Sequence, residues 1–344
     1  MQANSSSSAI YLRTMGDPYL SVFKSNLSAK FDGRSVLVSS KRPSVSLAGV
    51  LEILGVGNDD EVILPALCQS RHIVAIRRLG AIPVFTDIEL SDYAIDSDRI
   101  EEKITSRTKV IIITHLFGQP ALGIERILKI AQKNSLRLIE DISDAFGAKL
   151  LVNNEFRNVG SFGDIGYVDF SQVCKKYFKV GGIICKKDSV IHENLSKQQL
   201  LNSKFPLYLK ELTMIEKIYT QIESTREQRK DVAAYYENRL CDTGDLILQK
   251  VHQNSWNTFT RYIIRTTRKA ELSAFLDSEF QRSTVNYTLE RLFSSEKEGS
   301  YVQGSFPSAE RVVRESILLP ISGRHPVKEA ELVVDAIRLF FSQH

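Results

Sequence analysis

Short β-rich runs alternate with amphipathic helical windows along residues 35–185, and this alternation constrains the fold more than any other feature of the sequence. The expected strands lie at residues 35–38, 61–64, 82–86, 110–114, 136–140, 165–170 and 182–185. The windows between them space apolar residues three and four apart, as packed helices do, and lie at residues 45–54, 73–79, 97–104 and 124–133. Such alternation is typical of βαβ units, so we predict a three-layer α/β domain with a mostly parallel sheet.

The remaining sequence predicts a long helix and a second, smaller domain. Residues 207–240 carry charges on one face and apolar side chains on the other, which indicates a bridging helix. Strands are expected after it at residues 245–251 and 259–265, and helices at 269–278, 308–315 and 327–341. We therefore divide the chain into a flexible N-terminal tail (1–15), a large α/β domain (16–205), the bridging helix (206–240) and a small C-terminal α/β domain (241–344).

Composition favours an ordinary globular protein. The chain has 344 residues, 43% of them hydrophobic, and a net charge of +4 with interspersed signs, so neither a nucleic-acid groove nor a membrane surface is indicated. The four cysteines, at positions 68, 174, 185 and 241, have no metal-site spacing and fit a reducing compartment. No signal peptide or membrane span is evident. We expect a cytoplasmic protein without a metal.

Asp141 is the candidate for cofactor chemistry. It directly follows the strand expected at residues 136–140, where α/β sheets place their ligand sites. A carboxylate there can hold a pyridinium nitrogen protonated, which makes a pyridoxal ring an electron sink. The alternative is a helix N-cap or turn aspartate.

Two histidines follow strand ends. His115 comes after the strand at residues 110–114, and we expect it to point toward the same crevice as Asp141. A structural histidine bonded to backbone is the alternative. His72, beside Arg71 at the start of a helical window, could bind an anion, but a surface position is the simpler interpretation.

The stretch from residue 160 to 187 has the layout of a cofactor lysine loop. A strand ends at Phe170, a polar turn follows, and paired glycines lead into the next strand. Lys175, Lys176 and Lys179 in the turn are candidates for an amine that forms a Schiff base. The alternative is a solvated charge run.

The order of these pieces closely resembles the DegT/StrS family of pyridoxal-phosphate sugar aminotransferases, which have the aspartate aminotransferase type I fold. The matching runs are GVGNDDEVILP (55–65), GAIPVFTD (80–87), HLFGQP (115–120), IED (139–141), GA (147–148), VGSFGDIG (159–166) and GG (181–182). Weaker similarity continues through residues 229–236 and 307–320. The resemblance implies this PLP-transferase fold, a dimer, and a role for Asp141 at the pyridine nitrogen.

The family's lysine has no counterpart here. It lies four residues after the strand phenylalanine and seven before the paired glycines, and both distances lead to Cys174. A thiol can neither form the Schiff base nor shuttle protons as the ammonium does. Lys175 enters the site only if the turn slips by one residue, which redirects the side chain.

The phosphate contacts of the family are altered too. Its Ser-Gly-Thr turn becomes Arg42-Pro43-Ser44, where proline lacks an N–H, although Arg42 could bind an anion by itself. The serine that helps hold phosphate becomes Asp169, whose carboxylate would repel it.

Three further positions differ. The aromatic residue that stacks on the cofactor ring corresponds to Gln69, and the glutamine at the end of the acidic strand corresponds to Asp144. The Asn-x-Arg segment that reaches the partner subunit's cofactor aligns with Lys204 and Pro206. Together, these changes predict a folded chain unsuited to ordinary transamination.

The preferred hypothesis is therefore a pseudoenzyme of the sugar aminotransferase family that uses no cofactor. It would act in nucleotide-sugar or polysaccharide biosynthesis as a sugar-nucleotide binder, scaffold or regulator, as a homodimer or a mixed dimer with an active homologue.

Two alternatives stay open. One is an active aminotransferase that binds pyridoxal phosphate through Lys175. The other is an enzyme of altered chemistry, in which Cys174 is a thiolate nucleophile and His115 or Asp144 supplies the acid–base step. The observation against the latter is that a half-buried cysteine is usually a small apolar side chain.

Overall fold

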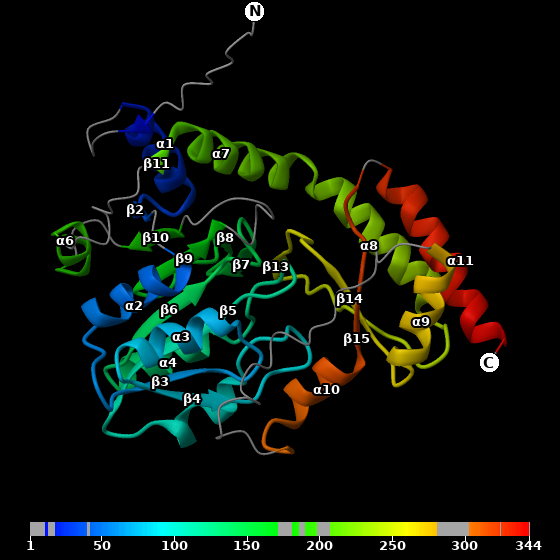
Figure 1. Cartoon of the computed structure of the whole chain (residues 1–344), viewed down its shortest axis with the longest axis horizontal. Helices are drawn as coiled ribbons and strands as arrows, with labels where there is room; N and C mark the ends of the chain where they lie inside the picture. The colour runs from blue at the N-terminus through cyan, green and yellow to red at the C-terminus, as the bar shows by residue number, and fades with distance from the viewer. Residues whose placement is uncertain are drawn as a thin grey trace, which may run out of the picture.

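The computed structural model describes residues 11–12, 18–39, 42–170, 181–185, 190–197, 207–280, 303–323 and 325–343. Most of the first 200 residues surround one large sheet, and the C-terminal third forms a second group of helices and strands beside it (Figure 1).

The large sheet has seven strands in the order β2-β10-β9-β6-β5-β3-β4. Their bounds are Ser35–Ser39 (β2), Glu61–Pro65 (β3), Ile82–Thr86 (β4), Thr108–Thr114 (β5), Arg137–Asp141 (β6), Ile165–Asp169 (β9) and Gly181–Cys185 (β10). Only β10 runs against its neighbours β2 and β9, and the other pairs are parallel. The predicted strands and the mostly parallel sheet are confirmed.

Helices cover both faces of this sheet. Helices α2 (Pro43–Ile53) and α3 (Ser70–Arg78) pack with one set of alternating strand residues that includes Ile112 and Ile139. Helix α4 (Ile124–Lys133) packs on the opposite face, against the set that includes Ile113 and Leu138. Over β2, β9 and β10 that second face is covered by α1 (Pro18–Lys30) and α7 (Leu209–Ser224). The three-layer α/β prediction is thus confirmed.

The inner strands β3, β5, β6 and β9 are buried over most of their length, which explains their near-continuous apolar runs. In β3 every residue from Glu61 to Pro65 is buried. The carboxylate of Glu61, the first residue of the strand, accepts hydrogen bonds from the side chains of Thr105, Arg107 and Thr108. These hydrogen bonds offset the cost of burying the carboxylate, so an acidic residue can stand at the start of a buried strand.

Two expected helices differ from the prediction. The window at residues 97–104 forms two 3-10 turns, Ser97–Arg99 and Glu101–Lys103, because the Asp96 side chain accepts from the Asp98 N–H and starts a tight turn. The long helix expected at residues 207–240 is broken at Thr225 into α7 and α8 (Arg226–Leu240). The Arg229 guanidinium spans the break, because it donates to the carbonyl oxygen of Ile222 at 2.6 Å and to that of Thr225 at 3.4 Å.

The C-terminal part has its own core around a small antiparallel sheet, β12-β14-β15. Its elements are β12 (Ile247–Leu248), β14 (Tyr262–Arg265), α9 (Lys269–Phe280), α10 (Pro307–Glu315), β15 (Ser316–Leu319) and α11 (Pro326–Gln343). The sequence interpretation overlooked β15 and made β12 too long. The division of the chain into domains stays a prediction.

Short antiparallel strands form two further sheets, and one of them joins the two parts of the chain. The strand β13 (Ser255–Trp256) pairs with β7 (Lys149–Val152), which pairs in turn with β8 (Glu155–Asn158). A further pair joins β1 (Tyr11–Leu12) to β11 (Leu207–Tyr208). None of these three pairs was predicted, since strands this short carry little periodicity.

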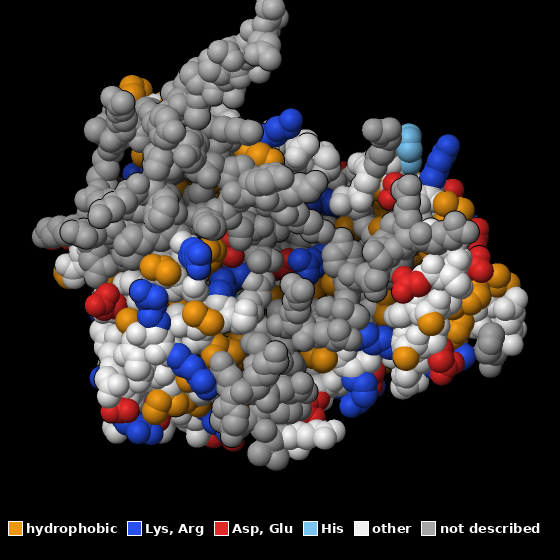
Figure 2. Space-filling model, viewed as in Figure 1, with side chains coloured by type: hydrophobic (Ala, Val, Ile, Leu, Met, Phe, Trp, Pro, Cys, Tyr) orange, Lys and Arg blue, Asp and Glu red, His pale blue; other side chains and the backbone are white. Residues whose placement is uncertain are grey.

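The described surface is mixed in charge. On the face seen in Figure 2, basic and acidic side chains lie among each other over the described atoms. None of the described helices is long and apolar enough to cross a bilayer. Within the same residues, no cluster of three or more His, Cys, Asp or Glu side chains could hold a metal ion.

Gly166 in β9 provides a test of this packing. A Cβ there would lie 2.4 Å from the carbonyl oxygen of Gly160, a backbone atom that cannot swing away. We expect Gly166→Ala to lower the free energy of unfolding by about 1–3 kcal/mol, the usual cost of overpacking. Urea unfolding measures it, with Gly57→Ala as the control, because a Cβ at Gly57 meets nothing closer than 3.8 Å. Equal stability of the two variants would contradict the close packing of β9.

Candidate functional site

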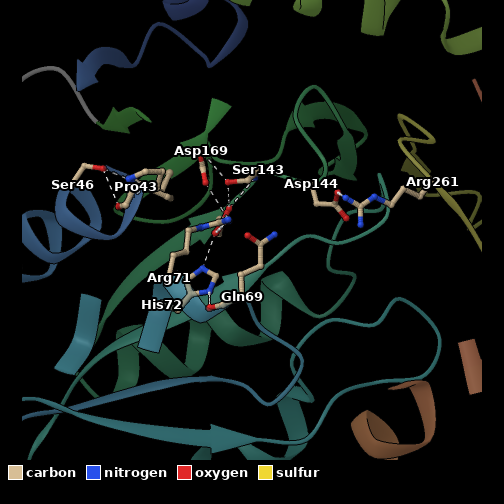
Figure 3. Close-up of polar contacts among 11 residues, drawn as sticks. Pro43, Ser46, Gln69, Arg71, His72, Ser143, Asp144, Asp169 and Arg261 are labelled. Carbon is tan, nitrogen blue, oxygen red and sulfur yellow. Dashed lines mark hydrogen bonds and ion pairs between the residues drawn. The ribbon is translucent and has the colours of Figure 1, made fainter. Parts of the chain in front are cut away.

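Asp141, the last residue of β6, is the centre of a buried polar cluster at the carboxyl end of the sheet. Its Oδ2 accepts from Nη2 of Arg71 at 2.5 Å and lies 2.7 Å from Nε2 of His72. Its Oδ1 accepts from the backbone N–H of Ser143 at 2.9 Å and from the Ser143 hydroxyl at 2.5 Å. Both carboxylate oxygens therefore have two protein donors each (Figure 3).

Helix α3 delivers two of these donors. It begins directly after the loop that follows β3, and its first turn places Arg71 and His72 on the buried face of the helix. A cation is disfavoured at a helix N-terminus because the helix dipole is positive there. The Asp141 carboxylate offsets this cost, so the two side chains point inward rather than into solvent.

His72 has an oxygen acceptor at each ring nitrogen. Its Nδ1 lies 3.0 Å from the carbonyl oxygen of Gln69, and its Nε2 faces Asp141. Neither oxygen can donate, so both contacts are hydrogen bonds only when both ring nitrogens carry hydrogen. In that state His72 contributes a second positive charge to the cluster.

A second carboxylate completes the cluster. Nη1 of Arg71 lies 3.4 Å from Oδ2 of Asp169 at the end of β9, and the Asp169 N–H donates to the Ser143 hydroxyl at 2.8 Å. Ser143 therefore connects the ends of β6 and β9. Two carboxylates, one guanidinium and one imidazole meet in the interior.

Electrostatics follow from this pairing. Burial alone would raise the pKa of Asp141, but the Arg71 charge and the hydrogen bonds from His72 and Ser143 hold it well below its usual range. Burial alone would lower the pKa of Arg71, and the carboxylates of Asp141 and Asp169 instead raise it. The ion pair is thus fully charged near neutral pH.

The N-terminus of α2 lies near this cluster and has few free donors. Pro43 has no N–H, and the N–H groups of Val45 and Ser46 both donate to the carbonyl oxygen of Arg42. The Tyr167 hydroxyl donates to the Pro43 carbonyl oxygen at 2.8 Å. In the first four positions of α2, only the Ser44 N–H is left without a bond inside the helix.

A family model described as the DegT/DnrJ/EryC1/StrS aminotransferase family matches residues 13–204 and 215–338. The chain belongs to this family. It is 28% identical over 309 residues to the dTDP-3-amino-3,6-dideoxy-alpha-D-galactopyranose transaminase of Aneurinibacillus thermoaerophilus, with 86% of this chain and 83% of that protein covered. It is 31% identical over 315 residues to the pleiotropic regulatory protein of Geobacillus stearothermophilus, with 85% and 81% covered.

A solved structure of the same fold is that of S. venezuelae DesV in complex with a ketimine intermediate. It superposes with a TM-score of 0.83 at 23% identity and covers 97% of this chain and 91% of that chain. The predicted family and the PLP-transferase fold are confirmed.

The structure separates two of the family positions that we expected to share a crevice. His115 is buried on the other face of the sheet, because the strand alternates sides and His115 continues the set of Ile111 and Ile113. Its Nδ1 accepts from the Ala121 N–H at 2.9 Å, and its Nε2 lies 3.3 Å from Oε2 of Glu140. The expected approach of His115 to Asp141 is not observed.

Asp144 fixes a backbone turn. Its Oδ2 accepts from the Phe117 N–H at 2.7 Å, and its carbonyl oxygen accepts from the Gly118 N–H at 3.0 Å. Phe117 and Gly118 both have positive φ, at 55° and 80°, so this turn needs such support. Burial raises the pKa of Asp144, while Arg261, 3.6 Å away, counteracts the rise. Its proposed acid–base role stays a prediction.

The other predicted positions fall in three places. Gln69 is partly buried at the N-cap of α3, beside His72 and Arg71 (Figure 3). Ser44 lies in the first turn of α2, and Asp169 lies in the cluster. Outside the described residues lie Cys174, Lys175, Lys176, Lys179, Lys204 and Pro206.

Sequence reasoning missed the partners of Asp141. The surface position expected for His72 is wrong, because its side chain is fully buried against Asp141, and Arg71 beside it is 8% exposed. One signal was available: two adjacent cationic residues at a helix start conflict with the helix dipole, which indicates a buried counterion.

We expect Asp141→Asn to lower the free energy of unfolding by about 3–5 kcal/mol at pH 7, because it leaves Arg71 and His72 without a full buried charge partner. The folded-state pKa of Asp141 is depressed. Its stabilising contribution is therefore present above the unfolded pKa of about 3.9 and is lost as the pH falls below that value. Urea unfolding at a series of pH values measures both effects.

Asp335→Asn is the matched control, since Asp335 is exposed on α11. It should unfold like the wild type at every pH. An Asp141→Asn protein whose stability falls with acid as steeply as the wild type would contradict the charge pairing.

Proposed function

We propose that this chain is a sugar-aminotransferase homologue that functions without pyridoxal phosphate. It binds a nucleotide sugar in the cytoplasm and acts as a regulatory or scaffolding partner in nucleotide-sugar or polysaccharide biosynthesis. In this role it forms a homodimer, or a mixed dimer with an active homologue.

The names of its relatives support the ligand class and the role. Similar proteins include a dTDP-amino-sugar transaminase and a UDP-N-acetyl-3-dehydro-alpha-D-glucosamine 3-aminotransferase. Another is named for a regulatory rather than a catalytic role. A nucleotide sugar is therefore the ligand to test first.

The observation that carries the proposal is the saturation of Asp141. An ionised carboxylate offers about four lone-pair sites. Arg71, His72 and the two donors of Ser143 fill all four. The N–H of a pyridinium ring needs one of these sites, and it would have to displace one of these buried donors to obtain it. The residues at this position do not fit the cofactor ring.

The N-terminus of α2, where the resemblance places the cofactor's phosphate, also supports a function without the cofactor. A helix N-terminus binds phosphate through free backbone N–H groups, and the first four positions of α2 keep only that of Ser44. The Asp169 carboxylate, which the resemblance places where the family has a serine, faces Arg71 and has no hydrogen to donate to a phosphate. The expected Cys174 at the lysine position would remove the covalent anchor as well.

Two other candidate functions are kept as outcomes of the test. A cofactor held by Lys175 would make the chain an active aminotransferase, and a reactive Cys174 would make it an enzyme of altered chemistry. For the altered chemistry the acid–base group would be His115 or Asp144, and burial raises the pKa of Asp144.

We expect the wild-type protein mixed with pyridoxal phosphate to show no absorption band of a bound cofactor and no rise in unfolding temperature. Borohydride treatment should leave every peptide unmodified, because no lysine is linked to the cofactor. A dTDP-, UDP- or GDP-linked sugar should instead raise the unfolding temperature. An active sugar aminotransferase of the family is the positive control for cofactor binding.

A reduced cofactor found on a peptide that contains Lys175 would overturn the proposal. Alkylation of Cys174 that abolishes a measured turnover would replace it with the altered-chemistry alternative. A failure of every nucleotide sugar to bind would contradict the ligand class.

A further inference from the structure

We infer that Asp141 and Asp169 form a receptor for a planar guanidinium cation, and that the chain fills this receptor itself with Arg71. This inference rests on the proposed function, because it names the group that stands in the crevice in place of a cofactor. The class of ligand is a cation with N–H donors in one plane.

The receptor is built from the ends of two strands. Asp141 ends β6 and Asp169 ends β9, and these strands are parallel neighbours. The Ser143 hydroxyl donates to Asp141 and accepts from the Asp169 N–H, which sets the spacing of the two carboxylates. Arg71 enters from a third element, α3, and its two terminal nitrogens face one carboxylate each, at 2.5 and 3.4 Å.

The bonding pattern of Arg71 is one that a free ion can reproduce. Its buried Nε has no hydrogen-bond partner, so the guanidinium is held by its terminal nitrogens alone. A free guanidinium ion offers the same nitrogens in the same plane. The rest of the arginine side chain acts as a tether, which makes binding intramolecular and therefore favours it over any ligand from solution.

The charges favour a resident cation. Two buried carboxylates in one cluster repel each other and would be strongly disfavoured together without compensation. The Arg71 guanidinium contacts both of them. Removing its side chain takes away the donors that face Asp141 and Asp169, and a small planar cation can supply donors in the same place.

Chemical rescue of Arg71→Ala tests the receptor. The variant should unfold roughly 5–10 °C below the wild type, as expected for a broken buried ion pair. Guanidinium chloride, at concentrations too low to denature, should raise its unfolding temperature in a saturable way. Urea has nearly the same planar shape without the charge and should give no rise. The wild type should respond to neither.

Two variants sharpen the result. Arg78→Ala removes an exposed arginine from the same helix and should behave like the wild type. Adding Asp141→Asn to Arg71→Ala should abolish the rescue, because the receptor loses half its charge. A guanidinium response that is equal in the two single variants, or that survives Asp141→Asn, would overturn the inference.

Arg71→Lys covers the case in which Arg71→Ala does not fold. Lysine keeps the charge but presents a point donor that cannot bridge two carboxylates as a fork does. It should unfold between the wild type and the alanine variant, so stability equal to that of the wild type would overturn the guanidinium assignment. Binding of pyridoxal phosphate by the wild type would refute the proposed function instead, and the two failures are measured separately.

Discussion

The carboxylate of Asp141, with its four protein donors, is the interaction on which the candidate site depends. It draws α3 onto the end of the sheet, holds the Arg71 guanidinium and the His72 imidazole in the interior and, through Ser143, joins β6 to β9. A buried ion pair gives little net stability because desolvation offsets attraction. Its larger effect is on specificity, since any arrangement that separates the partners leaves a buried charge alone.

The two acids at the end of β6 have separate tasks because adjacent strand residues face opposite sides of the sheet. Glu140 accepts from the N–H groups of Gly160, Phe162 and Gly163, and it faces His115. Asp141 faces α3. Glu140 therefore holds the loop that precedes β9 in place, while Asp141 binds the side chains of α3 on the opposite side of the sheet.

The sequence predicted the scaffold better than the site for a physical reason. Strands such as β3 and β5 are buried on both faces, so their apolar runs are unmistakable, and the family motifs fixed their order. The break at Thr225 leaves helical periodicity intact on both sides, which is why α7 and α8 were predicted as one helix. The partners of Asp141 lie about 70 positions away. Their contact depends on three-dimensional packing, and local pattern does not encode it.

His115 shows the limit of strand-end reasoning. Its place after β5 was predicted correctly, but one residue of alternation decides which face it meets, and that face is the one of α4. The same rule, applied to Ile139 and Asp141 together, puts Asp141 on the α3 side with Arg71. Counting whether a residue lies an odd or an even number of positions from a neighbouring core residue would therefore have predicted the sheet face of both His115 and Asp141.

The charged residues Arg71, Asp141 and Asp169 depend on one another. Arg71 contacts both buried acids, and without Asp141 and Asp169 it would be a buried cation at a helix N-terminus that lacks these two carboxylates. Each charge is costly alone and tolerable with the others. Pairing of Arg71 with both carboxylates lets the ends of β6, β9 and α3 pack together with charged groups in the interior, because each of these charges meets an opposite one within the fold.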